Sequence, residues 1–99
     1  MKITKNMYVE NTDASRGLAV YAINNRNIYF HWIKPVISNL QKKYVKGNFD
    51  ATKAIVAFYH VTTAASNFYN KDFGYKFSVT ERWTAAYNLL QEYMEDITE

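Results

Sequence analysis

Residues that form tight turns are scarce in this chain, which holds three glycines and one proline among its 99 residues. An all-β domain of this size needs many tight turns, and glycine and proline form most of them. Their scarcity therefore favours long helices with short connections. At this length, folding buries roughly 60–65% of the surface of the unfolded chain, which is enough for one hydrophobic core. We predict a single all-α domain over residues 1–99.

The clearest helix signal lies near the end of the chain. Ser78 and Glu81 have the spacing of a capping box, in which each side chain accepts a hydrogen bond from the other residue's backbone N–H. Polar residues, among them Thr84, alternate with an apolar face at helical spacing. That face comprises Val79, Trp83, Ala86, Tyr87, Leu90, Met94 and Ile97. The pattern predicts a helix over residues 79–96 with Trp83 on its core face.

A second helix is expected over residues 51–69, with Asp50 as its N-cap and Gly47 ending the preceding element. Its apolar residues form one stripe and also lie off that stripe. The stripe comprises Ala51, Ile55, Phe58, Thr62, Ala65 and Tyr69, and the others are Val56, Val61, Ala64 and Phe68. A helix that is apolar on most sides usually lies at the centre of its domain. We therefore expect a compact bundle of about four helices around it.

The segment upstream of Gly47 keeps a helical apolar period through Pro35. Inside a helix, proline removes one hydrogen bond and clashes with the carbonyl of the residue four positions earlier, here His31. One possibility is a single helix over residues 28–46 that is kinked at Pro35. The other is a short segment ending at Ile33, with a new helix starting at Pro35. The continuous apolar stripe favours the kinked helix.

The first part of the chain permits two interpretations. Asp13 can cap a helix that carries Leu18 and ends at residues 24–25. The alternative is an α+β fold with an N-terminal hairpin, whose strands would be residues 18–23 and 27–33. Farther along, residues 70–77 are expected to form a loop, with Phe73 and Phe77 folded down over the helix ends; a short strand is the alternative there.

Two segments resemble known proteins. They are Lys-Gly-Asn-Phe-Asp at residues 46–50 and Lys-Asp-Phe-Gly-Tyr-Lys-Phe-Ser at residues 71–78, with the neighbouring positions 53–54, 57–59, 82 and 85–86. Over residues 20–97 the chain resembles small, functionally unassigned accessory proteins of bacteriophages and mobile elements. The resemblance implies a protein of the host cytoplasm that binds and blocks a host factor, such as a defence nuclease. It implies no site residues.

Several kinds of chemistry are excluded or disfavoured by the residues present. The chain has no cysteine, which excludes thiol catalysis, cysteine-ligated zinc and iron–sulfur clusters. His31 and His60 have no carboxylate four residues away to complete a helical metal pair. Three isolated glycines cannot build a phosphate-binding loop. We expect no enzyme activity, no catalytic residues, no cofactor and no metal site, and we interpret the carboxylates of Glu92, Glu95 and Asp96 as a solvated helix face.

Positive charge is unevenly distributed along the chain. All twelve basic residues lie within residues 1–82, whereas residues 83–99 hold four acidic residues and no basic ones. Four lysines flank the expected connection before residue 51: Lys42, Lys43, Lys46 and Lys53. Lysines beside aromatic rings can bind nucleic acid, because the ammonium groups pair with phosphates and the rings stack on bases. A cationic last helical turn also complements the helix dipole, which explains part of this cluster without a ligand.

Nine Tyr, six Phe and two Trp are too many aromatic side chains for a core of this size to hide completely. Exposed tyrosines are good binding surface, since they offer a large contact area at little cost in conformational entropy. We predict that Tyr8, Tyr59 and Tyr75 are exposed and bind a partner. A contiguous patch would bind a host protein or form a homodimer, and the alternative function is nucleic-acid binding by the lysines.

No apolar run approaches the 18 or so residues that a membrane span needs. Residues 1–6 carry positive charge without a following apolar segment, so they do not form a signal peptide. We expect a cytoplasmic protein with no membrane partner. Its most specific expected function is that of a small protein-binding module, an inhibitor or modulator of a host factor.

Overall fold

A computed structural model describes residues 12–99, and every regular element in that range is helical. The elements are α1 (Asp13–Asn24), α2 (Arg26–Ile28), the π-helix η2 (Tyr29–Ile33), α3 (Lys34–Val45), α4 (Ala51–Phe73) and α5 (Val79–Thr98). The predicted all-α bundle is confirmed. The alternative hairpin is wrong, because both of its expected strands are helical.

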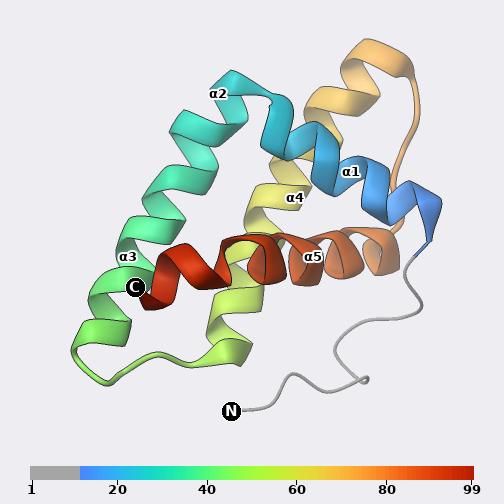
Figure 1. The fold of residues 1–99 in the computed structure, drawn as a ribbon. Helices are drawn as coiled ribbons and strands as arrows, with labels where there is room; N and C mark the ends of the chain where they lie inside the picture. The colour runs from blue at the N-terminus through green and yellow to red at the C-terminus, as the bar shows by residue number, and fades with distance from the viewer. Residues whose placement is uncertain (1–11) are drawn as a thin grey trace.

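The bundle is built around the crossing of α4 and α5. Figure 1 shows α5 passing across α4 at a steep angle, and both views show the axes of α3 and α4 running in roughly parallel directions. The α4–α5 interface is the largest in the molecule, and α5 also packs extensively on α1 and α3. The helix over residues 51–69 does contact every other helix, as expected. However, α5 makes the larger interfaces with α1 and α3, so the centre of the bundle is shared between the two helices.

The buried face of α5 differs from the face that the sequence predicts. Thr84 was expected on the polar face but is buried, and its hydroxyl donates to the Thr80 carbonyl at 3.0 Å. Conversely, Val79 was expected in the core and is 54% exposed. Trp83 is partly buried. A helix that is contacted from several sides buries more than one stripe of residues. A prediction based on one apolar stripe therefore assigns the residues at the edges of that stripe wrongly.

Pro35 is accommodated inside a continuous helical path. Backbone dihedrals at Ile33 and Lys34 are right-handed helical, and the Lys34 N–H donates to the Tyr29 carbonyl, five residues back. This π-turn lies immediately before Pro35. A π-bulge widens the helix by one residue and is a recognised cause of helix distortion. The expectation that one helix continues through Pro35 is therefore confirmed: the helical path runs from Arg26 to Val45, with a π-turn before the proline.

Three of the four helix caps that the sequence predicts are present in the structure. Asp50 caps α4 and the Ser78–Glu81 capping box starts α5. Gly47 follows α3 with φ 77°, and the N–H groups of Gly47 and Asn48 donate to the carbonyls of Tyr44 and Lys43, which is a Schellman motif. The expected N-cap of α1 is wrong: Thr12 occupies that position and Asp13 is the first helical residue.

Candidate functional site

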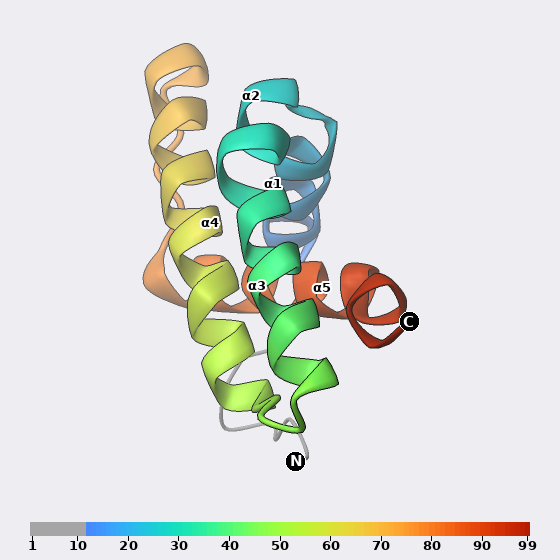
Figure 2. The same ribbon diagram turned by 90° about the vertical axis from the view of Figure 1, so that its left-hand side faces the viewer.

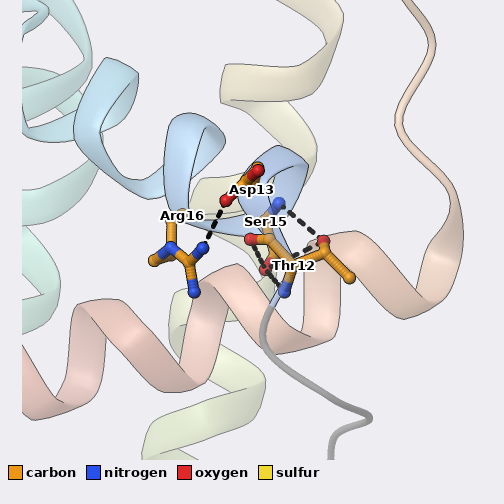
Figure 3. Close-up of polar contacts among 4 residues, drawn as sticks. All are labelled: Thr12, Asp13, Ser15 and Arg16. Atoms are coloured by element: carbon orange, nitrogen blue, oxygen red, sulfur yellow. Dashed lines mark hydrogen bonds and ion pairs between the residues drawn. The ribbon is translucent and has the colours of Figure 1, made fainter.

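One wall of the candidate site is the first part of α1, whose start is fixed by a capping box (Figure 3). The Ser15 N–H donates to the Thr12 hydroxyl at 3.1 Å, and the Thr12 N–H donates to the Ser15 hydroxyl at 3.0 Å. Asp13 lies in the first turn and forms an ion pair with Arg16. An acidic residue there also complements the positive end of the helix dipole. These contacts fix the backbone that carries Ala14 and Gly17.

The opposite wall comes from the end of α4 and its connection to α5. Here α4 continues past the expected end at residue 69 and stops at Phe73, because Gly74 adopts the left-handed conformation with φ 72°. The connection then descends beside the start of α1 (Figure 1). The expected loop is therefore shorter than residues 70–77.

Tyr75 is held in place by the capping box of α5. The Glu81 carboxylate accepts from the Ser78 N–H at 2.8 Å, and the Ser78 hydroxyl accepts from the Glu81 N–H at 3.0 Å. The same carboxylate accepts from the Tyr75 hydroxyl at 3.2 Å. Partial burial, followed by the nearby Glu81 carboxylate, raises the pKa of the Tyr75 phenol above its usual value. The residues that start α5 thus also orient Tyr75.

Five aromatic rings from three segments meet in this region, which we call the aromatic end: Tyr21, Tyr69, Phe73, Tyr75 and Phe77. Tyr69 lies at its centre, with ring centroids 5.1 Å from Tyr21 and 5.2 Å from Phe77. Edge-to-face geometry predominates, as at 71° between Tyr75 and Phe77, and such pairs are favourable beyond their buried area. The rings therefore support one another from the core to the surface.

Exposure differs sharply within the aromatic end. Phe77 is buried at 5% exposure, as expected, whereas Phe73 is 65% exposed. The expectation that Phe73 folds down over the helix ends is wrong, because α4 continues through Phe73 and points its ring outward from the last turn. Tyr75 is 44% exposed, in agreement with its predicted surface position.

A groove of about 270 Å³ opens between the two walls. Its lining residues are Asp13, Ala14, Gly17, Tyr69, Tyr75 and Phe77. A Cβ atom at Gly17 would meet no heavy atom within 4 Å, so the glycine faces open space. Pockets for small ligands and cofactors usually measure roughly 300–1,000 Å³. The groove is below this range and has the size for one large side chain.

Tyr59, another of the predicted partner-binding tyrosines, does not line the groove. Tyr59 was expected to be exposed but is partly buried, because its ring stacks on Trp83 with centroids 3.8 Å apart and Arg82 donates to its hydroxyl at 3.2 Å. That tyrosine stabilises the crossing of α4 and α5. Tyr8 lies outside the described residues.

The predicted lysines flank the connection between α3 and the start of α4, and we call this region the basic end: Lys42, Lys43, Lys46 and Lys53. All four side chains are exposed, and within residues 12–99 none of them forms an ion pair. Beside them, Tyr44 is 45% exposed and Val45 is 81% exposed. At roughly 1.5 Å per residue, the 23 residues of α4 separate the two ends by about 34 Å.

Of the six residues that line the groove, sequence reasoning assigned only Tyr75 to a binding site. Tyr69 was assigned to the core stripe of its helix, Phe77 to a ring folded over the helix ends, and Asp13 to a cap. Ala14 and Gly17 were assigned no role. One signal could have indicated the groove wall, since Gly74 placed after Phe73 is typical of a helix C-terminus. The approach of residues 13–17 to residues 69–77 is a tertiary contact that no local pattern encodes.

The described residues contain no group of three or more His, Asp or Glu side chains placed to hold a metal ion. His31 and His60 are both exposed. None of the helices within residues 12–99 is long and apolar enough to cross a membrane. Comparisons of the chain with protein-family models, with curated proteins and with solved structures found no match.

Proposed function

We propose that this protein is a protein-binding module whose groove at the aromatic end receives a large apolar side chain of its partner. The observation that carries the proposal is the groove itself: it is small, open and walled by the rings of Tyr69, Tyr75 and Phe77. Aromatic side chains are enriched among the residues that dominate binding energy in protein interfaces. A groove of about 270 Å³ fits a single anchoring side chain.

The aromatic end is also well ordered before any partner arrives, which favours binding. Contacts with neighbouring rings and the hydrogen bond to Glu81 restrain Tyr75. Immobilising a free side chain on binding costs roughly 0.5–1.5 kcal/mol, and that cost is reduced when the side chain is already fixed. Exposed Phe73 extends the apolar surface next to the groove.

The more specific form of the proposal depends on the resemblance to phage and mobile-element accessory proteins. In that form the partner is a host protein in the host cytoplasm, such as a component of a defence system, and binding inhibits or modulates it. The chain acts by binding and not by catalysis. A homodimer formed through the same groove is the competing arrangement.

A groove-filling variant tests the proposal without damaging the fold. Gly17→Leu adds a side chain where the structure has open space, and replacing glycine inside a helix raises helix stability. We expect Gly17→Leu to fold at least as stably as the wild type and to lose partner binding by about tenfold or more, the weight of a hot-spot contact. The matched control is Val56→Leu, at an exposed apolar position in α4 that does not line the groove.

Binding is measured in two steps. Proteins captured from a host lysate by the wild type, Gly17→Leu and Val56→Leu are compared by mass spectrometry, and the best candidate is then titrated against all three by calorimetry. Selective loss in Gly17→Leu supports the proposal. Equal binding by all three proteins would contradict it, and a concentration-dependent dimer that Gly17→Leu abolishes would favour the homodimer.

A further inference from the structure

The basic end carries four exposed lysines on the two helix ends that one connection joins. Within residues 12–99 none of these four lysines forms an ion pair. The carboxylate nearest in sequence, Asp50, is occupied as the N-cap of α4: one of its oxygens accepts from the N–H groups of Thr52 and Lys53 at 2.8 and 3.3 Å. The lysine charges therefore remain available to an external anion.

Two caps define the connection that the lysines flank. The Schellman motif after α3 reverses the chain at Gly47, and the Asp50 cap starts α4 three residues later. The connection is flanked by Lys42 and Lys43 in the last turn of α3, by Lys46 at the C-cap of α3 and by Lys53 in the first turn of α4. A cation cluster built on two helix ends has a defined shape, unlike one on a flexible tail.

An aromatic side chain stands beside these cations. The ring of Tyr44 is 45% exposed and is braced edge-on by Phe49, with centroids 6.2 Å apart and an interplanar angle of 77°. An edge-on brace fixes the orientation of the ring, and nearly half of its surface stays in solvent. Exposed, oriented rings next to lysines are the two elements of sequence-tolerant binding to single strands, in which bases stack and phosphates pair with cations.

Acidic residues bound this surface on one side. The last turns of α5 approach α3, where Gln41 donates to the Asp96 carbonyl at 2.9 Å, and Asp96 and Glu99 line a neighbouring groove with Lys34. These carboxylates disfavour a polyanion at the groove that Lys34, Asp96 and Glu99 line. The whole chain carries a formal net charge of +3 and a pI of about 9.1, which favours encounter with polyanions.

We propose that the basic end binds single-stranded nucleic acid, with Lys42, Lys43, Lys46 and Lys53 on the phosphates and Tyr44 stacked on a base. Single strands are favoured over duplexes because stacking on Tyr44 needs an unstacked base. This site is about 34 Å from the aromatic groove along α4. The inference is therefore independent of the proposed protein-binding function.

The test is fluorescence anisotropy with labelled oligonucleotides of about 12 bases, as single-stranded DNA, as RNA and as a duplex. Titrations run at several salt concentrations between about 50 and 200 mM. For four phosphate contacts on a single strand, the logarithm of the binding constant falls with the logarithm of salt with a slope of about −3. The DNA and RNA arms show whether the sugar matters, and both are expected to bind more tightly than the duplex.

Charge variants separate a site from general attraction. The double variant Lys42→Glu/Lys46→Glu is expected to weaken binding by about tenfold or more and to reduce the salt slope by about half. Its matched control, Lys71→Glu/Lys76→Glu, changes the net charge equally with two exposed lysines at the other end of α4. The control is expected to retain binding within about threefold, because these charges lie well beyond the screening length of roughly 8–10 Å. Equal losses in both doubles would overturn the proposal.

Three further measurements address base stacking, the chemistry of the ligand and the independence of the two sites. Tyr44→Ala is expected to weaken binding about tenfold with an unchanged salt slope, and a silent Tyr44→Ala would overturn the stacking part of the proposal. Polyglutamate of the same charge is expected to compete poorly, whereas competition equal to that of the oligonucleotide would show that the surface reads negative charge alone. Gly17→Leu should leave oligonucleotide binding unchanged, which separates this proposal from the groove.

Discussion

The two ends of α4 use their side chains in opposite ways. At the aromatic end, exposed Phe73 and Tyr75 connect through Tyr69 to buried Phe77, so the surface and the core form one continuous structure. At the basic end, the lysines form no ion pair within the described part of the chain, and the fold there is held by backbone caps. Side chains at the first end contribute to stability and binding together, whereas lysines at the second end can be changed almost independently of the fold.

The first prediction separates the buried and exposed parts of the aromatic end. Phe77→Ala deletes a ring that is 5% exposed and should reduce the free energy of unfolding by about 3–5 kcal/mol. Phe73→Ala deletes a ring that is 65% exposed and should cost about 0.5–1 kcal/mol. Urea denaturation of both variants checks this. Similar losses for the two would show that Phe73 is packed and that the surface described here is not free.

The second prediction contrasts a tyrosine of the core with one of the aromatic end. Burial, followed by the neighbouring Tyr29, Glu92 and Asp96, raises the pKa of Tyr93 to about 12, and its ring stacks on Phe58. In the unfolded chain the phenol ionises near pH 10. The unfolded state then binds fewer protons than the folded state, so this contribution to stability is intact below about pH 10 and is lost as the pH rises toward 12.

Urea midpoints between about pH 8 and 12 measure this loss for the wild type, Tyr93→Phe and Tyr75→Phe. The wild type should lose on the order of 2 kcal/mol more than Tyr93→Phe over that range. Tyr75→Phe should follow the wild type, because Tyr75 is 44% exposed and its ionised form stays in contact with water. The opposite ranking would place Tyr75 in the interior and would remove the difference between the core and the aromatic end.

The third prediction uses a backbone device that both ends share. Gly47 and Gly74 have φ of 77° and 72°, which an alanine adopts at a cost of roughly 1–2 kcal/mol. Gly47→Ala and Gly74→Ala should therefore destabilise the protein to a similar extent, by about 1 kcal/mol each. Gly17→Ala is the control, since it lies inside α1 with open space around it and should stabilise by about 0.5–1 kcal/mol. Thermal denaturation of the three variants gives the comparison; a cost at only one of the first two would show that the ends do not share this turn.

The same two ends show which features a sequence can reveal. Local chemistry predicted Gly47, the Asp50 cap and the Ser78–Glu81 capping box, because a cap depends on residues a few positions apart. The basic end is made of such neighbours, and the sequence located its four lysines. The groove could not be located in this way, since it brings the start of α1 against residues more than fifty positions later.

The wrong predictions from the sequence likewise concern features that depend on tertiary contacts. Tyr59 was expected to be exposed because the chain has more aromatic side chains than its core can hide, but Trp83 from α5 stacks on its ring. Thr84 was expected outside because it is polar, but its hydroxyl is satisfied by a carbonyl of its own helix and can be buried. Both errors concern the α4–α5 crossing, where a second helix decides what is buried. Single-helix periodicity contains no information about that partner.

The last and smallest prediction asks whether the lysines of the basic end serve the fold at all. Lys42 and Lys43 lie in the last turn of α3, where a cation interacts favourably with the helix dipole. Lys42→Glu/Lys46→Glu should therefore cost about 0.5–1 kcal/mol at low salt, and the cost should disappear near 1 M salt, where the screening length is only about 3 Å. Denaturation by urea at both salt concentrations measures it. A cost well above 2 kcal/mol that persists in high salt would show that these side chains pack against the rest of the protein. The lysines of the basic end would then not be available to bind a partner.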